Sequence, residues 1–288
     1  MGEWAPVPRA PTRISGTMVR MTDADREIGT PMRLTGRTAL VTGVSRRRGI
    51  GFAVAARLAE LGASVVIHHH TAHDAEQYGA ADNLDALLDD LRQHLRPGAR
   101  VAEVPGDLST AGGPRAVVEA AVTCLGHLDV LVCNHAHGGD AVSLRTATAE
   151  ALDTHWDVNT RATLLLTQAF AEQHDGRRGG RVVWMTSGQG LGPMPDNLAY
   201  AVSKAALAGA TASVAAELAE AQILLNTINP GPVNTGYLDD APDAVLERFP
   251  AHRLGRPDDP ARLIAWLVSD EGEWMVGQVL HSEGGFRR

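Results

Sequence analysis

The sequence lacks the features that mark secreted and membrane proteins. None of its apolar runs approaches the length of a membrane span, which needs about 20 residues. The N-terminus has no hydrophobic stretch followed by a small-residue cleavage site, so a signal peptide is not indicated. Cysteine is scarce, because Cys124 and Cys133 are the only two, and each lies in an apolar segment. We therefore expect a cytoplasmic protein with two buried free thiols.

The chain also has fewer basic than acidic side chains. The 288 residues include 26 lysines and arginines against 34 aspartates and glutamates, which gives a formal net charge of -8. An acidic chain of this kind disfavours nucleic acids and anionic lipid surfaces as partners. We expect no nucleic acid and no membrane among the partners of this protein.

The chain divides into an N-terminal extension and one domain. Residues 1–34 contain prolines and arginines without apolar periodicity, which predicts a flexible extension. Residues 35–288 are enough for one large α/β domain, and a domain of this size needs no disulfide or metal to stay folded.

Short apolar runs alternate with amphipathic segments from residue 37 onward, which predicts strands that alternate with helices. This pattern indicates a single-domain α/β fold, a doubly wound parallel sheet of about seven strands with helices on both faces. The expected strands lie at 38–43, 63–68, 100–108, 127–134 and 180–187, with two more in ILLNTINPG and VGQVLHSEGG. The expected helices lie at 51–62, 83–95, near 113–125, 150–174 and 199–220, with a brief one around 243–249.

A glycine-rich loop, TGVSRRRGIG at residues 42–51, joins the first expected strand to the first expected helix. Gly43, Gly49 and Gly51 are informative in this context, because such a turn brings a helix N-terminus close to a bound pyrophosphate. The loop therefore predicts a dinucleotide-binding site.

The residues around this loop favour NADP(H) over NAD(H). An NAD site normally has an acid about 20 residues further on, at the end of the second strand. His68–His70 stand there instead, and the nearest acid, Asp74, lies beyond the strand end. We expect Arg48 to bind the 2′-phosphate, assisted by Arg47 or His70, since arginine makes charge-assisted bidentate bonds to phosphate. The alternative is that the loop arginines are solvated surface residues, and the histidine spacing does not favour a metal site.

Tyr200 and Lys204 are four residues apart at the start of an expected helix, so they share one face. A neighbouring ammonium favours the phenolate, which would allow Tyr200 to exchange a proton with a carbonyl or alcohol oxygen. Ser187 ends an expected strand, and it could hydrogen-bond the same oxygen.

The order of these motifs resembles the short-chain dehydrogenase/reductase family. The resemblance covers residues 36–286, and the C-terminal segment is similar to the 3-oxoacyl-ACP reductase branch. It implies a Rossmann fold and hydride transfer between a nicotinamide and a carbonyl or secondary alcohol. The implied catalytic residues are Asn159, Ser187, Tyr200 and Lys204. The implied cofactor-binding positions, beyond the loop residues and His70, are Asp107, Leu108, Asn134, Tyr200, Lys204, Pro230, Gly231, Val233 and Thr235, with Ser45 and Ile50 added inside the loop.

The sequence departs from the family pattern at two places that matter. The glycine loop is two residues longer than usual, and the extra length is arginine-rich. The segment that usually reads Asn-Asn-Ala-Gly is CNHA, residues 133–136, so Cys133 and His135 are unexpected. His135 and His137 would lie near the cofactor, where they would either tune pH dependence or fill space, and filling space is favoured. Residues 236–257 are expected to cover the substrate.

These observations favour an NADPH-dependent carbonyl reductase with a small-molecule substrate and no metal. The alternatives are an NAD-linked alcohol dehydrogenase and a non-catalytic dinucleotide-binding sensor. The small residues of the helix expected over 199–220 allow close helix contact, and in the family this helix packs on its symmetry mate. The resemblance therefore implies a homotetramer, with a dimer as the alternative.

Overall fold

The computed structural model describes residues 32–71, 82–138, 141–236 and 238–287. The main compact unit begins at Met32, three residues before the expected domain boundary. Most of the extension expected over residues 1–34 lies outside the described residues, and so does Asp74.

Seven parallel strands form one sheet in the order β3-β2-β1-β4-β5-β6-β7. The central strand β1 places Val41 opposite Ile67 of β2 on one side and Val132 of β4 on the other. The order reverses direction beside β1, which is the place where doubly wound folds bind ligands at their carboxyl edge. The predicted fold class is confirmed. The strands are β1 Thr38–Val41, β2 Ser64–His69, β3 Val101–Pro105, β4 Val130–Cys133, β5 Gly180–Met185, β6 Ile223–Asn229 and β7 Val279–His281.

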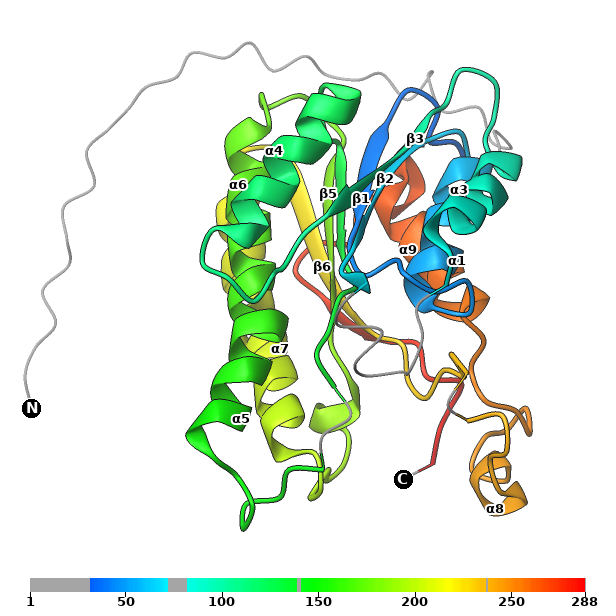
Figure 1. The fold of residues 1–288 in the computed structure, drawn as a ribbon, viewed down its shortest axis with the longest axis vertical. Helices are drawn as coiled ribbons and strands as arrows, with labels where there is room; N and C mark the ends of the chain where they lie inside the picture. The colour runs from blue at the N-terminus through cyan, green and yellow to red at the C-terminus, as the bar shows by residue number, and fades with distance from the viewer. Residues whose placement is uncertain (1–31, 72–81, 139–140, 237, 288) are drawn as a thin grey trace, which may run out of the picture. The chain divides into compact units, whose positions relative to one another are not determined.

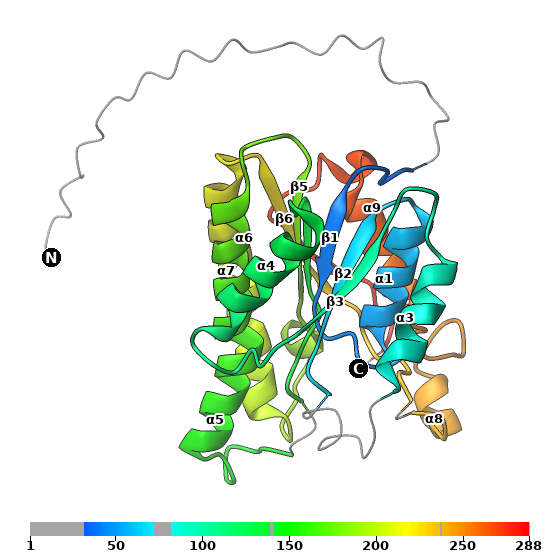
Figure 2. The same cartoon turned by 45° about the horizontal axis from the view of Figure 1, so that its top comes forward.

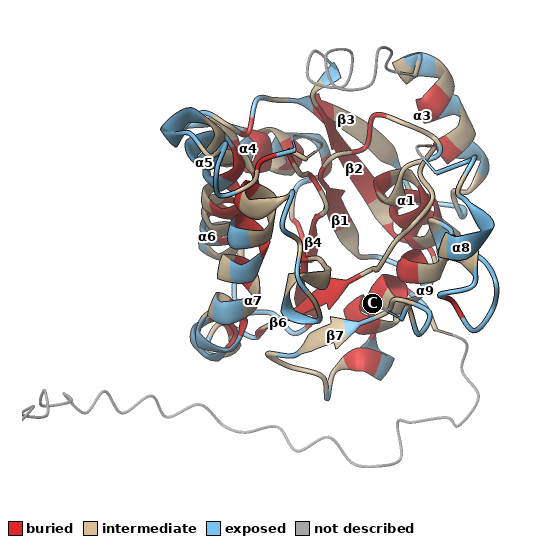
Figure 3. Cartoon of the chain, turned by 90° about the horizontal axis from the view of Figure 1, so that it is seen from below, coloured by how far each residue is buried: buried red, intermediate tan, exposed pale blue. Residues whose placement is uncertain are grey.

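Helices cover both faces of the sheet (Figure 1, Figure 2). One layer consists of α1 (Ile50–Glu60), α3 (Leu84–Gln93) and α9 (Asp258–Val268). The other contains α4 (Gly113–Leu125), α6 (Ala162–Gln173) and α7 (Leu198–Ala219). Each layer buries its own apolar cluster against the sheet, and Figure 3 shows the central strands buried between the two layers while the edge strands β3 and β7 are mostly intermediate.

The segment expected to be one helix over 150–174 is divided into three parts. Helix α5 (Ala149–His155) runs into a π-helical turn, η2 (Trp156–Arg161), which leads into α6. A π turn adds a residue to the helical repeat and so changes which side chains face inward. Asn159 lies in this turn and is fully buried.

Two local expectations differ from the structure. The sequence analysis did not identify α9, although two acids and a proline at its start (Asp258–Pro260) are a typical helix beginning. Cys133 is buried as expected, but Cys124 is exposed because it lies on the outer side of α4. Neither cysteine forms a disulfide.

Contrary to the expectation that no apolar run approaches the length of a membrane span, helix α7 is long and apolar enough to cross a membrane by length and composition alone. Its inner side packs on β6 and η2, and it buries Leu207 and Leu218 in the core. It is therefore a core helix of the α/β fold. Its exposed residues are mostly small and apolar and include Val202, Ala205, Gly209, Ala212 and Ala216.

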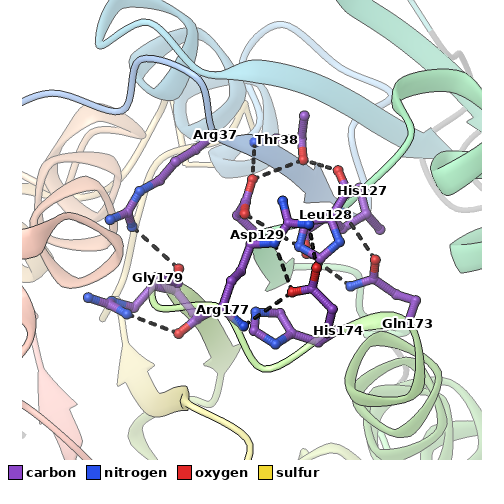
Figure 4. Close-up of polar contacts among 12 residues, drawn as sticks. Arg37, Thr38, His127, Leu128, Asp129, Gln173, His174, Arg177 and Gly179 are labelled. Atoms are coloured by element: carbon purple, nitrogen blue, oxygen red, sulfur yellow. Dashed lines mark hydrogen bonds and ion pairs between the residues drawn. The ribbon is translucent and has the colours of Figure 1, made fainter. Parts of the chain in front are cut away.

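A polar cluster closes the opposite end of the sheet, at the amino ends of β1, β4 and β5 (Figure 4). The Asp129 carboxylate accepts the backbone N–H of Thr38 at 2.8 Å, and Gln173 bonds both backbone groups of Leu128. Arg37 donates to the carbonyl of Val268 at 2.9 Å and pairs with Asp270. These bonds satisfy backbone groups that would otherwise be buried without partners.

Candidate active site

The strongest functional candidate is a cleft of about 460 Å³ at the carboxyl ends of β1, β2 and β4. Its position is the one expected for a ligand in a doubly wound sheet. The residues that line it are Gly43, Ser45, Arg46, Gly49, Ile50, His68, His70, Asp107, Leu108, Ser109, Asn134, His135, Ala136, His137, Thr154, Val158 and Thr235.

The glycine loop has the close backbone approach that a dinucleotide site requires. Gly43 has φ +71°, and a Cβ there would lie 2.7 Å from the Cα of His135. A Cβ at Gly51 would lie 2.6 Å from the carbonyl oxygen of Gly43. Gly49 is the N-cap of α1 and contributes no capping side chain, so the first-turn amides remain available to an anion. The cradle therefore fits a pyrophosphate.

Asn134 fixes the shape of this cradle. Its side-chain amide donates to the carbonyls of Thr42 and Gly43, at 3.0 Å each. Its backbone N–H donates to the hydroxyl of Thr42 at 3.0 Å. The end of β4 is thereby fastened to the turn that leaves β1.

His135 fills the space below the cleft and joins two elements. Its Nε2 donates to the carbonyl of Val158 in η2 at 3.0 Å, so its Nδ1 accepts from the Thr42 hydroxyl at 2.7 Å. Burial, with smaller contributions from His68 and Lys204, lowers the pKa of His135 to about 3. The ring is therefore neutral near pH 7, which agrees with the favoured interpretation that it fills space.

The expected histidine cluster of β2 is divided between two sets of partners. His68 donates from Nε2 to the carbonyl of Gly106 at 3.0 Å and accepts the backbone N–H of Gly43 at 3.3 Å. Burial lowers the pKa of His68 to about 4. His69 bonds the Glu103 carboxylate at 2.7 Å, and His70 lines the cleft. The described residues contain no group of three or more histidines, cysteines or acids arranged to hold a metal.

The three loop arginines point to three different places. Arg46 lines the cleft and donates to the carbonyl of Thr235 at 3.2 Å. Arg47 pairs with Asp90 of α3, and Arg48 pairs with Asp239. Among the described residues, the cleft lining includes neither Arg47 nor Arg48. The two arginines that the sequence singled out for the 2′-phosphate therefore lie elsewhere, because carboxylates far along the chain bind them.

The predicted catalytic residues of η2 and α7 are brought together beside the cleft. The Nζ of Lys204 lies 5.7 Å from the centre of the Tyr200 ring. The side chain of Asn159 accepts the backbone N–H of His137 at 2.7 Å and donates to its carbonyl at 2.9 Å. It also donates to the Ser203 hydroxyl at 3.0 Å, which links η2 to the helix that carries Tyr200.

Residues 137–138 complete the surroundings of Tyr200. His137 lines the cleft, and its ring packs edge-on against His155 with centroids 4.7 Å apart. A Cβ at Gly138 would lie 3.5 Å from the Tyr200 ring, so this backbone runs directly beside the phenol. Asn159 therefore holds the segment against which Tyr200 lies.

Lys204 is the only lysine in the sequence, and its side chain is almost fully buried. Its Nζ donates to the carbonyl of Met185 at the end of β5, at 2.9 Å. Burial lowers the pKa of the Lys204 ammonium to about 8. Cys133 is close enough to interact with this ammonium, while burial raises the pKa of its thiol. Both groups therefore remain protonated near pH 7.

The remaining predicted positions lie around the same carboxyl edge of the sheet. Ser187 is half-buried directly after β5, where its backbone N–H donates to Gln189. Asp107 accepts from Ser109, and it lines the cleft together with Leu108. Gly231 has φ +68°, and a Cβ there would lie 2.4 Å from the Cβ of Glu283. Ser45, Ile50 and Thr235 line the cleft, while Pro230 and Val233 lie in the loop after β6.

Sequence reasoning missed the structural roles of Thr42 and Ser203, and it named Arg46 only as one of three loop arginines. The Thr42 hydroxyl bonds Asn134 and His135 directly after β4, and the Ser203 hydroxyl accepts the Asn159 amide. Thr42 directly precedes Gly43, and Ser203 directly precedes Lys204, so each stands beside a residue that was identified. Proximity to those motifs was the only available signal.

A glycine cradle at a helix N-terminus, with a tyrosine and a buried lysine beside it, defines a dinucleotide-binding oxidoreductase site. A family model described as enoyl-(acyl carrier protein) reductase matches residues 43–287. The uncharacterized oxidoreductase YjdA of Bacillus subtilis is 38% identical over 256 residues, which cover 87% of this chain and 96% of that protein.

Solved structures agree with this assignment. LugOII, described as a promiscuous reductase that catalyses keto-reduction at C1 in lugdunomycin biosynthesis, is 32% identical with a TM-score of 0.76. The match covers 88% of this chain and 98% of LugOII. The landomycin C-6 ketoreductase LanV, solved with NADP and rabelomycin, is 27% identical with a TM-score of 0.74, over 88% of this chain and 97% of LanV. The chain belongs to the short-chain dehydrogenase/reductase family, as the motifs predicted.

The lowered pKa of Lys204 predicts how stability depends on pH. An unfolded lysine has a pKa of about 10.4, so between pH 8 and that value the unfolded chain binds more protons. The free energy of unfolding should therefore rise with pH across this window, and no other lysine contributes. Between about pH 7.5 and about pH 9, wild type should gain about 1 kcal/mol relative to Lys204→Met.

Urea denaturation of the cofactor-free protein at the two pH values measures this difference. The thiol of Cys133 acts in the opposite direction, because its raised pKa makes the unfolded chain lose its proton first. That contribution is present in both proteins and cancels in the comparison. If the free energies of unfolding of wild type and Lys204→Met change equally between the two pH values, folding does not lower the pKa of Lys204.

Proposed function

We propose that this protein is an NADPH-dependent reductase that converts a ketone or 3-oxoacyl-type carbonyl to a secondary alcohol. The observation that carries the proposal is the placement of Tyr200 beside the buried Lys204 and against Gly138, whose neighbour His137 lines the dinucleotide cleft. When bound, the nicotinamide supplies the hydride and its electron pair. The protein must then supply a proton to the carbonyl oxygen.

Tyr200 is the proposed proton donor. The Lys204 ammonium lies close to its ring, and a neighbouring cation stabilises the phenolate that remains after proton transfer. Ser187 is proposed to hydrogen-bond the substrate oxygen from the end of β5. Asn159 holds residues 137–138 against Tyr200 and joins η2 to α7 through Ser203. The reverse reaction would use the same groups.

The proposed preference for NADPH rests on Arg46 and on the absence of an acid at the end of β2. Arg46 and His70 line the cleft together, where an adenosine 2′-phosphate would need positive charge. Residues 68–70 are all histidine. LanV, a related ketoreductase, was solved with NADP, which supports the same choice for this chain. Asp74, the nearest acid, lies outside the described residues.

The substrate class is proposed from the related reductases. LanV was solved with rabelomycin, and LugOII reduces a ketone in lugdunomycin biosynthesis. We propose that this protein also accepts ketones of the kind that LugOII and LanV reduce, in addition to simpler ketones and 3-oxoacyl thioesters. A cytoplasmic location agrees with two free cysteines and with this soluble cofactor.

Replacing Tyr200 with Phe should remove catalysis and keep cofactor binding. Loss of a positioned acid lowers turnover by about 10²- to 10⁴-fold. NADPH oxidation is measured with a panel of polycyclic ketones, simple ketones, quinones and 3-oxoacyl thioesters. The affinity for NADPH, measured by fluorescence, should stay within about twofold because the phenol hydroxyl is not the main anchor of the cofactor.

The panel separates the proposed function from its alternatives. Turnover with NADPH that is lost in Tyr200→Phe supports the reductase. Tight NADPH binding without turnover on any compound would favour a dinucleotide sensor. Alcohol oxidation with NAD that exceeds every NADPH-linked reduction would favour the dehydrogenase.

Replacing Arg46 with Ala should weaken NADPH binding and leave NADH binding unchanged. A charge-assisted bond to a phosphate contributes enough to raise the NADPH Kd about 10- to 100-fold when it is lost. Arg57→Ala is the matched control, because Arg57 pairs with Glu60 on the outer side of α1. An equal loss of affinity for NADPH and for NADH in Arg46→Ala would contradict a specific role of Arg46 at the 2′-phosphate.

The exposed face of α7 supports the proposed homotetramer. Val202 is 49% exposed, and Trp156 of the neighbouring η2 is 45% exposed, which is unusual for large apolar residues. A charge at this face would oppose a contact between two copies, so Val202→Asp should reduce the mass in solution to that of a smaller assembly. Light scattering measures the mass of both proteins. A wild-type monomer would contradict the proposal.

A further inference from the structure

The two arginines that lengthen the glycine loop point away from the cleft. Arg47 pairs with Asp90 on α3. Arg48 donates from Nη1 to one carboxylate oxygen of Asp239 at 2.7 Å, and its Nη2 bonds the other oxygen. Asp239 follows Arg48 by 191 residues and lies in residues 236–257, the segment expected to cover the substrate. The added length of the loop thus contacts α3 and the segment expected to cover the substrate.

Asp239, which accepts the hydrogen bonds from Arg48, lies at the end of a tight turn. The side chain of Asn234 accepts the backbone N–H of Gly236 at 2.9 Å and donates to Asp239 at 3.0 Å. Gly236 has φ +112°, and a Cβ there would lie 3.8 Å from the guanidinium carbon of Arg48. The Arg48 side chain therefore lies over this turn and bonds the carboxylate at its end.

A second contact lies beside the first. Arg46 donates to the carbonyl of Thr235, so two arginines of one loop hold the chain directly after β6. The segment then continues through α8 (Asp243–Leu246), which lies on the same side of the sheet as α1 and α9 (Figure 1, Figure 3). The covering segment is defined as residues 238–250 of the expected segment, and Arg48 attaches it to the cofactor loop at Asp239, just beyond the Thr235 contact.

The pair remains charged across the working range of pH but is open to solvent. Hydrogen bonds from Arg48 first, and from Asn234, lower the pKa of Asp239 to about 2. The Arg48 and Asp239 side chains are 59% and 49% exposed. Exposed pairs are weakened by salt, so this contact should respond to ionic strength.

We propose that Arg48 is a positioning residue that holds the covering segment against the cofactor loop through Asp239. The proposal rests on the proposed reductase function, because it assigns the segment to the substrate side of that site. A segment fixed before the substrate arrives loses less conformational freedom on binding, which lowers the substrate KM. Arg48 then affects substrate binding through the covering segment, whereas Arg46 is the residue proposed to contact the cofactor.

The test compares Arg48→Ala, Asp239→Ala and the exchanged pair Arg48→Asp with Asp239→Arg. Arg57→Ala is the matched control, since it removes an exposed arginine–carboxylate pair from the neighbouring α1. Hydrogen exchange of residues 238–250 is measured without substrate. Steady-state kcat and KM and the NADPH Kd are measured on the same proteins.

Both single variants should exchange faster in the covering segment and lose roughly three- to fivefold in kcat/KM, mainly through KM. The NADPH Kd should stay unchanged in both. The exchanged pair should restore the slow exchange and the KM. In wild type, about 0.5 M NaCl should speed exchange toward the variants, because screening weakens the exposed pair.

Two results would overturn the proposal. Unchanged exchange in both single variants would show that the pair does not hold the segment. A raised NADPH Kd in Arg48→Ala, absent from Asp239→Ala, would make Arg48 the phosphate ligand that the sequence suggested. Hydrogen exchange needs no turnover, so it decides the role of Arg48 even if no carbonyl compound is reduced.

Discussion

The side-chain amide of Asn134 donates to two consecutive carbonyls, those of Thr42 and Gly43. These bonds hold the turn in which Gly43 takes a positive φ and the chain enters α1. They also require Gly51, because a Cβ there would lie 2.7 Å from the same amide nitrogen. The direction of α1, and with it the orientation of its free amides toward a pyrophosphate, depends on this one side chain.

Neutral histidines extend this support across the floor of the cleft. His68 joins the loops after β1 and β3, and His135 joins β1 to η2. Both rings use both nitrogens, and burial keeps both uncharged. These two rings therefore bring no positive charge to the cleft, which Arg46 and the N-terminus of α1 border. The histidines contribute rigidity, which an active site needs when it must hold a proton donor in place.

The sequence allowed the sheet and most helices to be predicted, because apolar periodicity is a local property. The placement of Tyr200 beside Lys204 could be predicted as well, since the two residues are related by one helical turn. The partners of Arg47 and Arg48 could not be predicted. Each arginine binds a carboxylate on an element far along the chain, and no local pattern reveals which of three adjacent cations meets a distant acid. The π turn at Asn159 was missed for a related reason, because it is set by packing against α7.

The solitary lysine has a consequence for how this protein can be modified. All other basic side chains besides histidine are arginine, so Lys204 carries the only ε-amino group in the chain. That group is buried beside Tyr200. Acylation, glycation or conjugation to a lysine therefore has no harmless surface site to occupy. Any such modification of an ε-amino group must either follow opening of the fold or occur at the residue that we propose supports proton transfer. Both outcomes would be measured as a loss of the proposed activity.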